Sequence, residues 1–184
     1  MKLEFNIGKW TEGQHNTIED RLRIKQKNIA KALDYDICIS FMFNDFQNVL
    51  FCRGIYSRNA KLEKETIPQN DFLNKKIYRL MKKSMDSKSI ISNYCHGSCS
   101  LCKRGTCPII EDIESEVFIP IFHPCDSEQS TLKVLGCLYL ASYERKEFPL
   151  QFFTEDELMK DDILAISNMV ALSLSQFKEG INAV

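Results

Sequence analysis

The residues of this chain with the clearest capacity for chemistry are four cysteines that fall within 13 positions, in the segment YCHGSCSLCKRGTCP. Their pattern is C-x3-C-x2-C-x4-C-P, one residue looser at two gaps than the ferredoxin-type loop. Thiolate sulfur is the soft ligand that iron–sulfur clusters and zinc both select. The candidate metal ligands are therefore Cys95, Cys99, Cys102 and Cys107.

The residues between these cysteines suit a tightly wrapped cluster. Gly97 and Gly105 allow the positive φ angles that a tight loop needs. Lys103 and Arg104 favour thiolates and offset their clustered negative charge. The main interpretation is a [4Fe–4S] cluster bound by the four thiolates, with His96 as a further candidate ligand.

Two other interpretations of the segment stay open. The same spacings fall within the range of zinc sites, and zinc would make the loop a structural clip without redox chemistry. Alternatively, the chain is a thiol-dependent enzyme, in which Cys52 or Cys95 with a lowered pKa acts as the nucleophile.

The other cysteines lie apart from this segment. Cys38, Cys52 and Cys137 fall in apolar stretches with the pattern of strands, where a free cysteine behaves as a small apolar residue. Cys125 and His123 follow another such stretch and are interpreted as turn residues.

Apolar periodicity predicts the elements that must position the cysteine segment. In residues 36–43, Ile37, Ile39, Phe41 and Phe43 alternate with Cys38, Ser40 and Met42, as in a strand with two distinct faces. We expect helices over residues 16–33, 70–85 and 154–177, and strands over 36–43, 49–56, 89–92, 117–122 and 134–143. Thr154 with Glu157 predicts the cap of the last helix.

The order of these elements predicts an α+β fold, with a largely antiparallel sheet flanked by helices. Pro120 inside an apolar strand requires an edge, a bulge or a strand start. Gly136 would weaken its strand unless a backbone or a ligand approaches it closely.

The 184 residues predict one domain. We expect an N-terminal segment over 1–15, a single domain over 16–178 with its cysteine-rich loop at 94–110, and a tail over 179–184. The first residues lack the apolar core of a signal peptide, and the chain has no apolar run of about 18 residues. These features predict a cytoplasmic protein without a membrane partner.

Charge is divided between the two halves of the chain. Residues 1–110 hold 19 basic and 11 acidic side chains, whereas residues 111–184 hold 5 and 14. We interpret the division as two halves that face each other within one fold. The basic face of the helix at 70–85 reads as a solvated surface, so a nucleic-acid partner is not expected.

Three blocks of the sequence, in order, resemble the GAF domain family. KALDYDICISFMFNDFQNVLFCRG is similar to the first helix end and first hairpin of that family. VFIPIF and VLGCLYLASY are similar to its two central strands. FFTEDELMKDDILAISNMVALSLSQ is similar to its final helix, so the resemblance spans residues 15–178.

The resemblance implies a PAS-related architecture with a small-molecule pocket over one face of the sheet. It also implies a sensory module rather than an enzyme, a homodimer formed through the terminal helices, and a separate output protein such as a kinase or a regulator. The function predicted is a cytoplasmic sensor whose cysteine loop binds an iron–sulfur cluster and responds to redox state, oxygen or nitric oxide.

Two departures from relatives narrow this expectation. Members that bind cyclic nucleotides carry an Asn-Lys pair where this chain has Ser142 and Tyr143. The branch that reduces free methionine sulfoxide carries a Gly-Val-Cys-Gly type of turn, which this chain lacks. The enzymatic alternative therefore rests on the abundance of cysteine.

Overall fold

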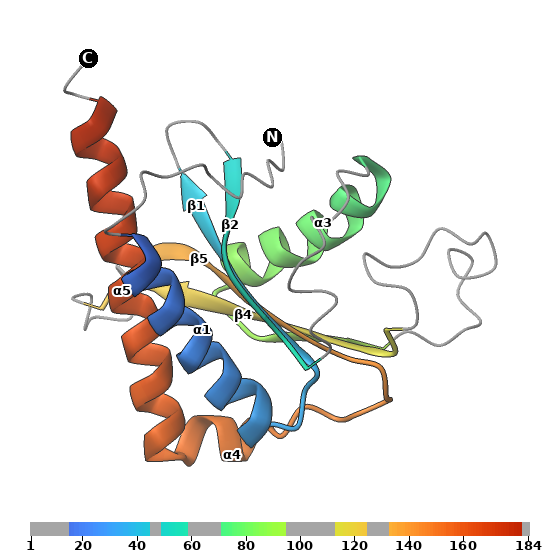
Figure 1. The fold of residues 1–184 in the computed structure, drawn as a ribbon. Helices are drawn as coiled ribbons and strands as arrows, with labels where there is room; N and C mark the ends of the chain where they lie inside the picture. The colour runs from blue at the N-terminus through green and yellow to red at the C-terminus, as the bar shows by residue number, and fades with distance from the viewer. Residues whose placement is uncertain (1–14, 45–48, 59–70, 95–112, 125–132, 182–184) are drawn as a thin grey trace.

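The computed structural model describes residues 15–44, 49–58, 71–94, 113–124 and 133–181 (Figure 1). These residues form a five-stranded antiparallel sheet in the order β2-β1-β5-β4-β3. Its strands are β1 (Ile37–Asn44), β2 (Val49–Ser57), β3 (Ile91–Tyr94), β4 (Ser115–Phe122) and β5 (Val134–Ser142). The predicted α+β class with an antiparallel sheet is confirmed.

Helices cover both faces of this sheet (Figure 1). The helices are α1 (His15–Ala32), α3 (Asp71–Ser87), α4 (Leu150–Glu155) and α5 (Glu157–Ile181). Side chains of α1, α4 and α5 share one apolar core with one face of the strands, whereas those of α3 share a second core with the other face. We call the second side the α3 face.

Strand β1 divides its side chains between the two cores as its alternation predicts. Ile37, Ile39 and Phe41 are buried on the α3 face. Cys38 and Met42 are buried against the helices α1 and α5. An alternation with a period of two residues is what a pleated strand imposes, so both sides of this strand are apolar because both are covered.

The predictions for Gly136 and Pro120 are confirmed. A Cβ atom on Gly136 would lie 1.9 Å from the carbonyl oxygen of Phe41, so another backbone does approach that glycine. Pro120 pairs with Cys137 on one side, and the described part of β3 pairs no further along β4 than Phe118 on the other. The proline therefore occupies an edge position, where no partner needs its missing N–H.

The helices α1 and α3 end in the same way, with a residue other than glycine in the left-handed conformation. Asp34 has φ of 55° and Lys88 has φ of 51°. After α1, the N–H of Tyr35 donates to the carbonyl of Ala30 at 2.7 Å. This is the bond of a Schellman cap, which satisfies carbonyls that the helix leaves open at its end.

The C-terminal helical region differs from its prediction. Thr154 does not cap the long helix, because it lies inside α4 and its hydroxyl donates to the carbonyl of Leu150 at 2.9 Å. Asp156 separates the two helices, and its Oδ1 accepts the N–H of Met159 at 2.8 Å, as an N-cap does. Leu158, in the first turn of α5, is 76% exposed.

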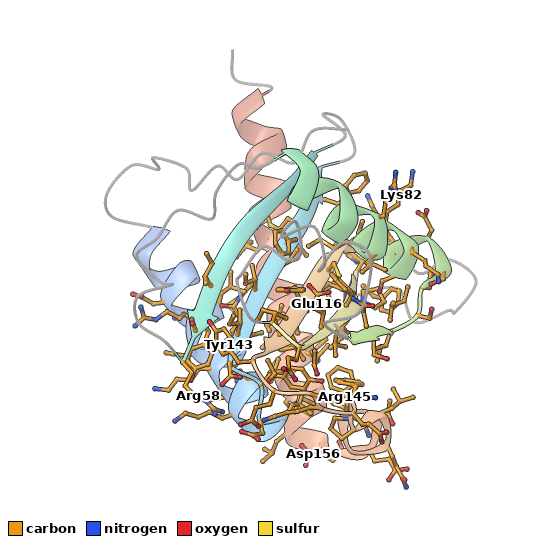
Figure 2. All side chains as sticks on the ribbon, turned by 90° about the vertical axis from the view of Figure 1, so that its right-hand side faces the viewer. Arg58, Lys82, Glu116, Tyr143, Arg145 and Asp156 are labelled. Carbon is orange, nitrogen blue, oxygen red and sulfur yellow. The ribbon has the colours of Figure 1, made fainter. Side chains whose placement is uncertain are left out.

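The charged surfaces of α3 and of the α4–α5 junction lie on opposite sides of the sheet. The exposed side chains of α3 include Arg79, Lys82 and Lys83, and Lys82 projects outward in Figure 2. The first turns of α5 carry Glu157 and Asp161 on the far side. The ion pair between Lys25 of α1 and Asp162 of α5, 2.6 Å long, joins the two sequence halves across a helix–helix contact. Among the described helices, none is both long and apolar enough to cross a membrane.

Candidate functional site

The strands β3 and β4 hold the two ends of the cysteine segment together. Tyr94, the last residue of β3, pairs with Ser115, the first residue of β4. Cys95 follows Tyr94 directly in the sequence. The hairpin therefore closes the base of the loop that carries the predicted ligands. The predicted ligands Cys95, Cys99, Cys102 and Cys107, and the additional candidate His96, lie outside the described residues.

A buried carboxylate lies next to this base, on the α3 face. Glu116 is 1% exposed (labelled in Figure 2). Its Oε2 accepts a hydrogen bond from Asn93 Nδ2 at 2.9 Å, and its Oε1 accepts one from the Tyr139 hydroxyl at 3.0 Å. Asn93, Glu116 and Tyr139 come from three adjacent strands, and we call them the buried polar triad.

The strand register explains how these three side chains meet. Asn93 pairs with Glu116 across β3 and β4, and Tyr139 pairs with Phe118, two residues further along β4. Residues two apart on a strand share a face, so all three project to the α3 side. Tyr139 also packs against the Phe118 ring, with ring centroids 5.3 Å apart.

The hydrogen-bonding groups of the triad determine what it could bind. Both of its donors, an amide and a phenol, are neutral, and a buried carboxylate is costly unless it is well hydrogen-bonded or paired with a cation. Its apolar surroundings on the α3 face include Ile37, Ile39 and Ala141. The arrangement can accept further hydrogen bonds, because each carboxylate oxygen has more than one acceptor direction.

The buried polar triad was not among the candidate sites that the sequence indicated. A usable signal was present in the stretch SEVFIPIF, where Glu116 lies two residues before Phe118 and therefore on the same strand face. A carboxylate at an inward position of a strand that is apolar on both sides requires a buried partner. Its partners could not be identified, because the pairing of β4 with β3 and β5 is a long-range feature.

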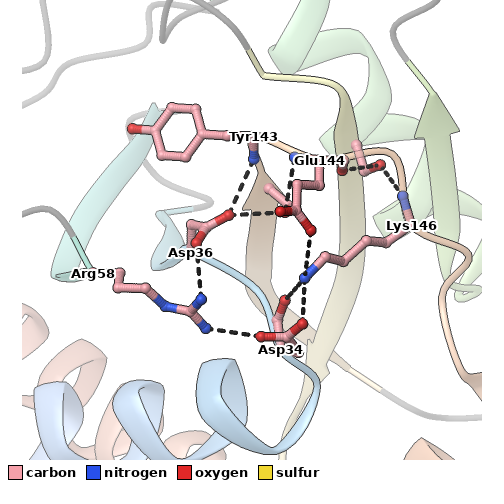
Figure 3. Close-up of polar contacts among 8 residues, drawn as sticks. Asp34, Asp36, Arg58, Tyr143, Glu144 and Lys146 are labelled. Carbon is pink, nitrogen blue, oxygen red and sulfur yellow. Dashed lines mark hydrogen bonds and ion pairs between the residues drawn. The ribbon is translucent and has the colours of Figure 1, made fainter.

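A second polar network ties several strand ends to the turn after α1 (Figure 3). We call it the strand-end cluster, and its members are Asp34, Asp36, Arg58, Ser115, Ser142, Tyr143, Glu144 and Lys146. Asp36 Oδ2 accepts the Ser142 hydroxyl at 2.8 Å and the Tyr143 N–H at 3.1 Å. Its other oxygen lies 3.4 Å from Arg58. Ser142 and Tyr143 therefore bind Asp36 and hold the end of β5 to the start of β1.

Lys146 and Arg58 set the charge balance around Asp34. Hydrogen bonds from Lys146 and Arg58 hold the pKa of the Asp34 carboxyl below its ordinary value. The same contact with Asp34 raises the pKa of the Arg58 guanidinium. Each shift favours the charged form of its group, so the cluster is a set of ion pairs at neutral pH.

Two of the scattered cysteines are core residues, as predicted. Cys38 and Cys137 are fully buried with free thiols, on opposite faces of the sheet. Burial raises the pKa of both thiols, which makes them poor nucleophiles. The backbone of Cys52 pairs with Phe41 in β1, and its side chain lies outside the described part of the structure, as does Cys125.

The described residues place no three histidine, cysteine, aspartate or glutamate side chains where they could jointly hold a metal ion. Within that part of the chain, the buried polar triad and the strand-end cluster are the polar assemblies that contact the start of β4. Ser115 of the cluster and Glu116 of the triad are the first two residues of β4, close to where the chain leaves the cysteine segment. The segment itself stays a predicted metal site.

No family model matches this sequence, and no curated protein matches it. Solved structures do match its fold. A type II free methionine-R-sulfoxide reductase from Thermoplasma acidophilum aligns with TM-score 0.53 and 13% identity over 85% of this chain and 94% of its own. The GAF domain of a two-component sensor histidine kinase from Bacillus halodurans aligns with TM-score 0.52 and 16% identity, over 84% and 96%.

A third structure, the blue-light absorbing form of the PixJ GAF domain from Thermosynechococcus elongatus, aligns with TM-score 0.54 and 10% identity over 91% of this chain and 95% of its own. Identities this low establish a shared fold and nothing finer. The three matched proteins differ in what they do, and a shared fold does not choose among such functions.

Proposed function

We propose that this chain, which has the fold of a GAF domain, is a cytoplasmic sensory module whose cysteine segment binds a [4Fe–4S] cluster. The observation that carries the proposal is the closed base of the segment, where Tyr94 of β3 pairs with Ser115 of β4. A loop with both ends fixed can concentrate four thiolates around one centre at a lower entropic cost than four separate segments.

The donor set fits such a cluster. Four thiolates, from Cys95, Cys99, Cys102 and Cys107, are the ligands that cubane iron–sulfur clusters take. When bound, the cluster would supply one-electron chemistry that is sensitive to oxygen and nitric oxide. The chain's own part is to hold the four sulfurs and to carry a change in the charge or order of the loop into β3 and β4.

The sensory role is supported by the kind of protein that shares the fold. Two of the matched structures are GAF domains, one of them from a sensor histidine kinase. We therefore propose that this chain acts on a separate output protein, such as a kinase or a regulator, and that a small-molecule ligand is a second input. We propose that the basic surface of α3 faces solvent and does not bind a nucleic acid.

A series of serine substitutions tests the cluster. Cys99→Ser or Cys102→Ser should lower bound iron after anaerobic purification by at least about half, since each removes one of four ligands. Ser98→Ala, a change in the same segment, and Cys137→Ala, a thiol buried outside it, are the matched controls and should leave iron unchanged. Full iron retention in both cysteine variants would contradict the proposal.

Zinc is the second candidate for the same four ligands. A zinc-bound loop would be a structural clip, so a chelator would lower the melting temperature while redox reagents would have no effect. The donor set alone does not separate the two metals, because thiolates serve both. Metal analysis of the same preparations separates them.

A thiol-dependent enzyme is the third candidate, supported by the fold match to a free methionine-R-sulfoxide reductase. The described thiols argue against it, because Cys38 and Cys137 are buried and their pKa values are raised. The candidate nucleophiles are Cys52 and Cys95, whose side chains lie outside the described part of the structure. Turnover of free methionine sulfoxide with a thiol reductant, lost in Cys52→Ser or Cys95→Ser, would favour this candidate over the sensor.

We further propose a homodimer formed through the terminal helices. The side chains of Leu158, Leu164 and Leu172 on α5 are 76%, 49% and 52% exposed, and Ile24 on α1 is 56% exposed. Apolar side chains spread along exposed helix faces in this way suit contact with a second copy. Leu158→Glu with Leu172→Glu should convert the dimer to a monomer in sedimentation, whereas Leu150→Glu on α4 should not.

A further inference from the structure

The exit of the cysteine segment is tied directly to the end of β5. The backbone N–H of Glu114 donates to the carbonyl of Ser142 at 2.9 Å. One residue later, the Ser115 hydroxyl donates to the carbonyl of Glu144 at 2.9 Å and accepts the backbone N–H of Lys146 at 2.7 Å. Ser115 is 1% exposed, so these bonds form away from bulk water.

Lys146 extends this connection to the end of α1. Its Nζ donates to the backbone carbonyl of Asp34 at 2.6 Å and also forms an ion pair with the Asp34 carboxylate. Asp34 is the left-handed residue of the Schellman cap that ends α1. The Lys146 side chain is 18% exposed, so it is largely enclosed at this junction (Figure 3).

Lys146 also lies within the connection, residues 143–149, from β5 to the C-terminal helices. Four residues after it, Leu150 starts α4, and α5 follows. A hydrogen-bonded path from Ser115 through Lys146 to Asp34 thus reaches the end of α1 and the link that leads into α4. Hydrogen-bond networks between elements can carry energetic coupling, and a coupling measurement decides whether a given network does.

We propose that the contacts of Ser115 with Lys146 and of Lys146 with Asp34 form a coupling device, through which the metal content of the cysteine segment sets the order of the α1 end and of the link into α4. This inference rests on the proposed function, because it names the route by which that site acts. A shift of the segment exit moves Ser115, and the loss of its bond to Lys146 loosens the Asp34 cap.

Hydrogen exchange followed by mass spectrometry tests the device on the full chain. Protein purified anaerobically with its metal is compared with the same protein after chelation. Chelation should speed exchange about fivefold in peptides covering residues 30–36, 113–116 and 143–150, a size typical of coupling between sites. Lys146→Met keeps the aliphatic stem and removes the ammonium, so it should abolish the response at residues 30–36 while the response at residues 113–116 remains.

Arg58→Gln is the matched control, because it breaks ion pairs to Asp34 and Asp36 but leaves the bond from Lys146 to Asp34. It should keep the response at residues 30–36. If Lys146→Met fails to fold, Ser115→Ala breaks the same path one step earlier and should have the same effect.

The outcomes separate this inference from the function on which it rests. A wild-type protein that binds metal but shows no exchange response at residues 30–36 would overturn the coupling device alone. An unchanged response in Lys146→Met would do the same. A wild-type protein without bound metal would overturn the proposed function, and the device would fall with it.

Discussion

At the scale of single residues, Gly136 shows how a close backbone contact fixes the sheet. It pairs with Met42 across β1 and β5, and a Cβ atom there would lie 1.9 Å from the carbonyl oxygen of Phe41. Backbone cannot swing aside as the end of a flexible side chain can, so any larger residue must separate the two strands. Those strands form the centre of the sheet between the two cores.

Gly136→Ala should therefore lower the free energy of unfolding by about 3 kcal/mol or more, the upper end of the cost of overpacking. Gly54→Ala is the matched control, because a Cβ at that position meets the terminal amide of Gln26 at 3.0 Å. The end of that side chain is buried and hydrogen-bonded to Ser40, but it can shift further than backbone, so the loss should be smaller, about 1 kcal/mol. Denaturant unfolding measures both, and equal losses would contradict the crowding argument.

Asp34 gives the strand-end cluster a dependence on pH. Its lowered pKa means that the folded protein prefers the carboxylate, so its contribution to stability is complete above the ordinary value of 3.8. That contribution is lost as the pH falls through the lower pKa of the folded state. Asp34→Asn keeps a residue suited to a positive φ and removes the charge.

The stability difference between wild type and Asp34→Asn should thus be largest near neutral pH and vanish in acid. Because Asp34 is solvent-exposed, added salt should reduce the difference as well. Thermal unfolding across pH 2 to 7, at about 0.05 M and about 0.5 M salt, measures both effects. A difference that stays constant with pH would show that the carboxylate is not the group responsible.

At the scale of elements, strand alternation was the most informative signal in the sequence. The alternation in β1 correctly predicted which residues would share each face, because a pleated strand leaves no other choice. The end of the chain was harder to predict, since Thr154 and Asp156 are both good caps. Asp156 is the residue that caps α5, because its carboxylate accepts the N–H of Met159.

The end of α3 offers a position where a substitution should stabilise the protein. Lys88 adopts φ of 51° at the end of α3, a conformation that costs a residue with a Cβ atom about 1 kcal/mol. Lys88→Gly should therefore raise the free energy of unfolding by about 1 kcal/mol. The reference is Lys82→Gly, an exposed position inside the same helix, which should lower it by about 1 kcal/mol. A loss in both variants would show that Lys88 contributes through its side chain.

At the scale of the whole molecule, the sequence predicted the architecture better than it predicted the polar assemblies inside it. Apolar periodicity is local, and the order of elements restricts how an antiparallel sheet can be connected. The buried polar triad and the strand-end cluster depend instead on contacts such as that of Ser142 with Asp36, 106 positions apart. Local pattern carries no information about pairs so distant.

The division of charge shows the same limit. The two halves of the sequence were expected to face each other, and Lys25 with Asp162 is one such contact between helices. The basic residues of α3, however, lie across the sheet from the acidic residues of α5. Net charge along a chain describes composition, whereas the fold decides which surfaces those charges occupy.

We propose that one loop, closed at its base by β3 and β4, holds a metal cluster on a GAF fold. The decisive measurement is the content of metal and acid-labile sulfide after strictly anaerobic purification. We expect about four iron atoms and about four sulfides per chain. One zinc without sulfide would contradict the cluster and make the loop a structural clip. Protein that contains neither iron nor zinc would contradict a metal site in this loop.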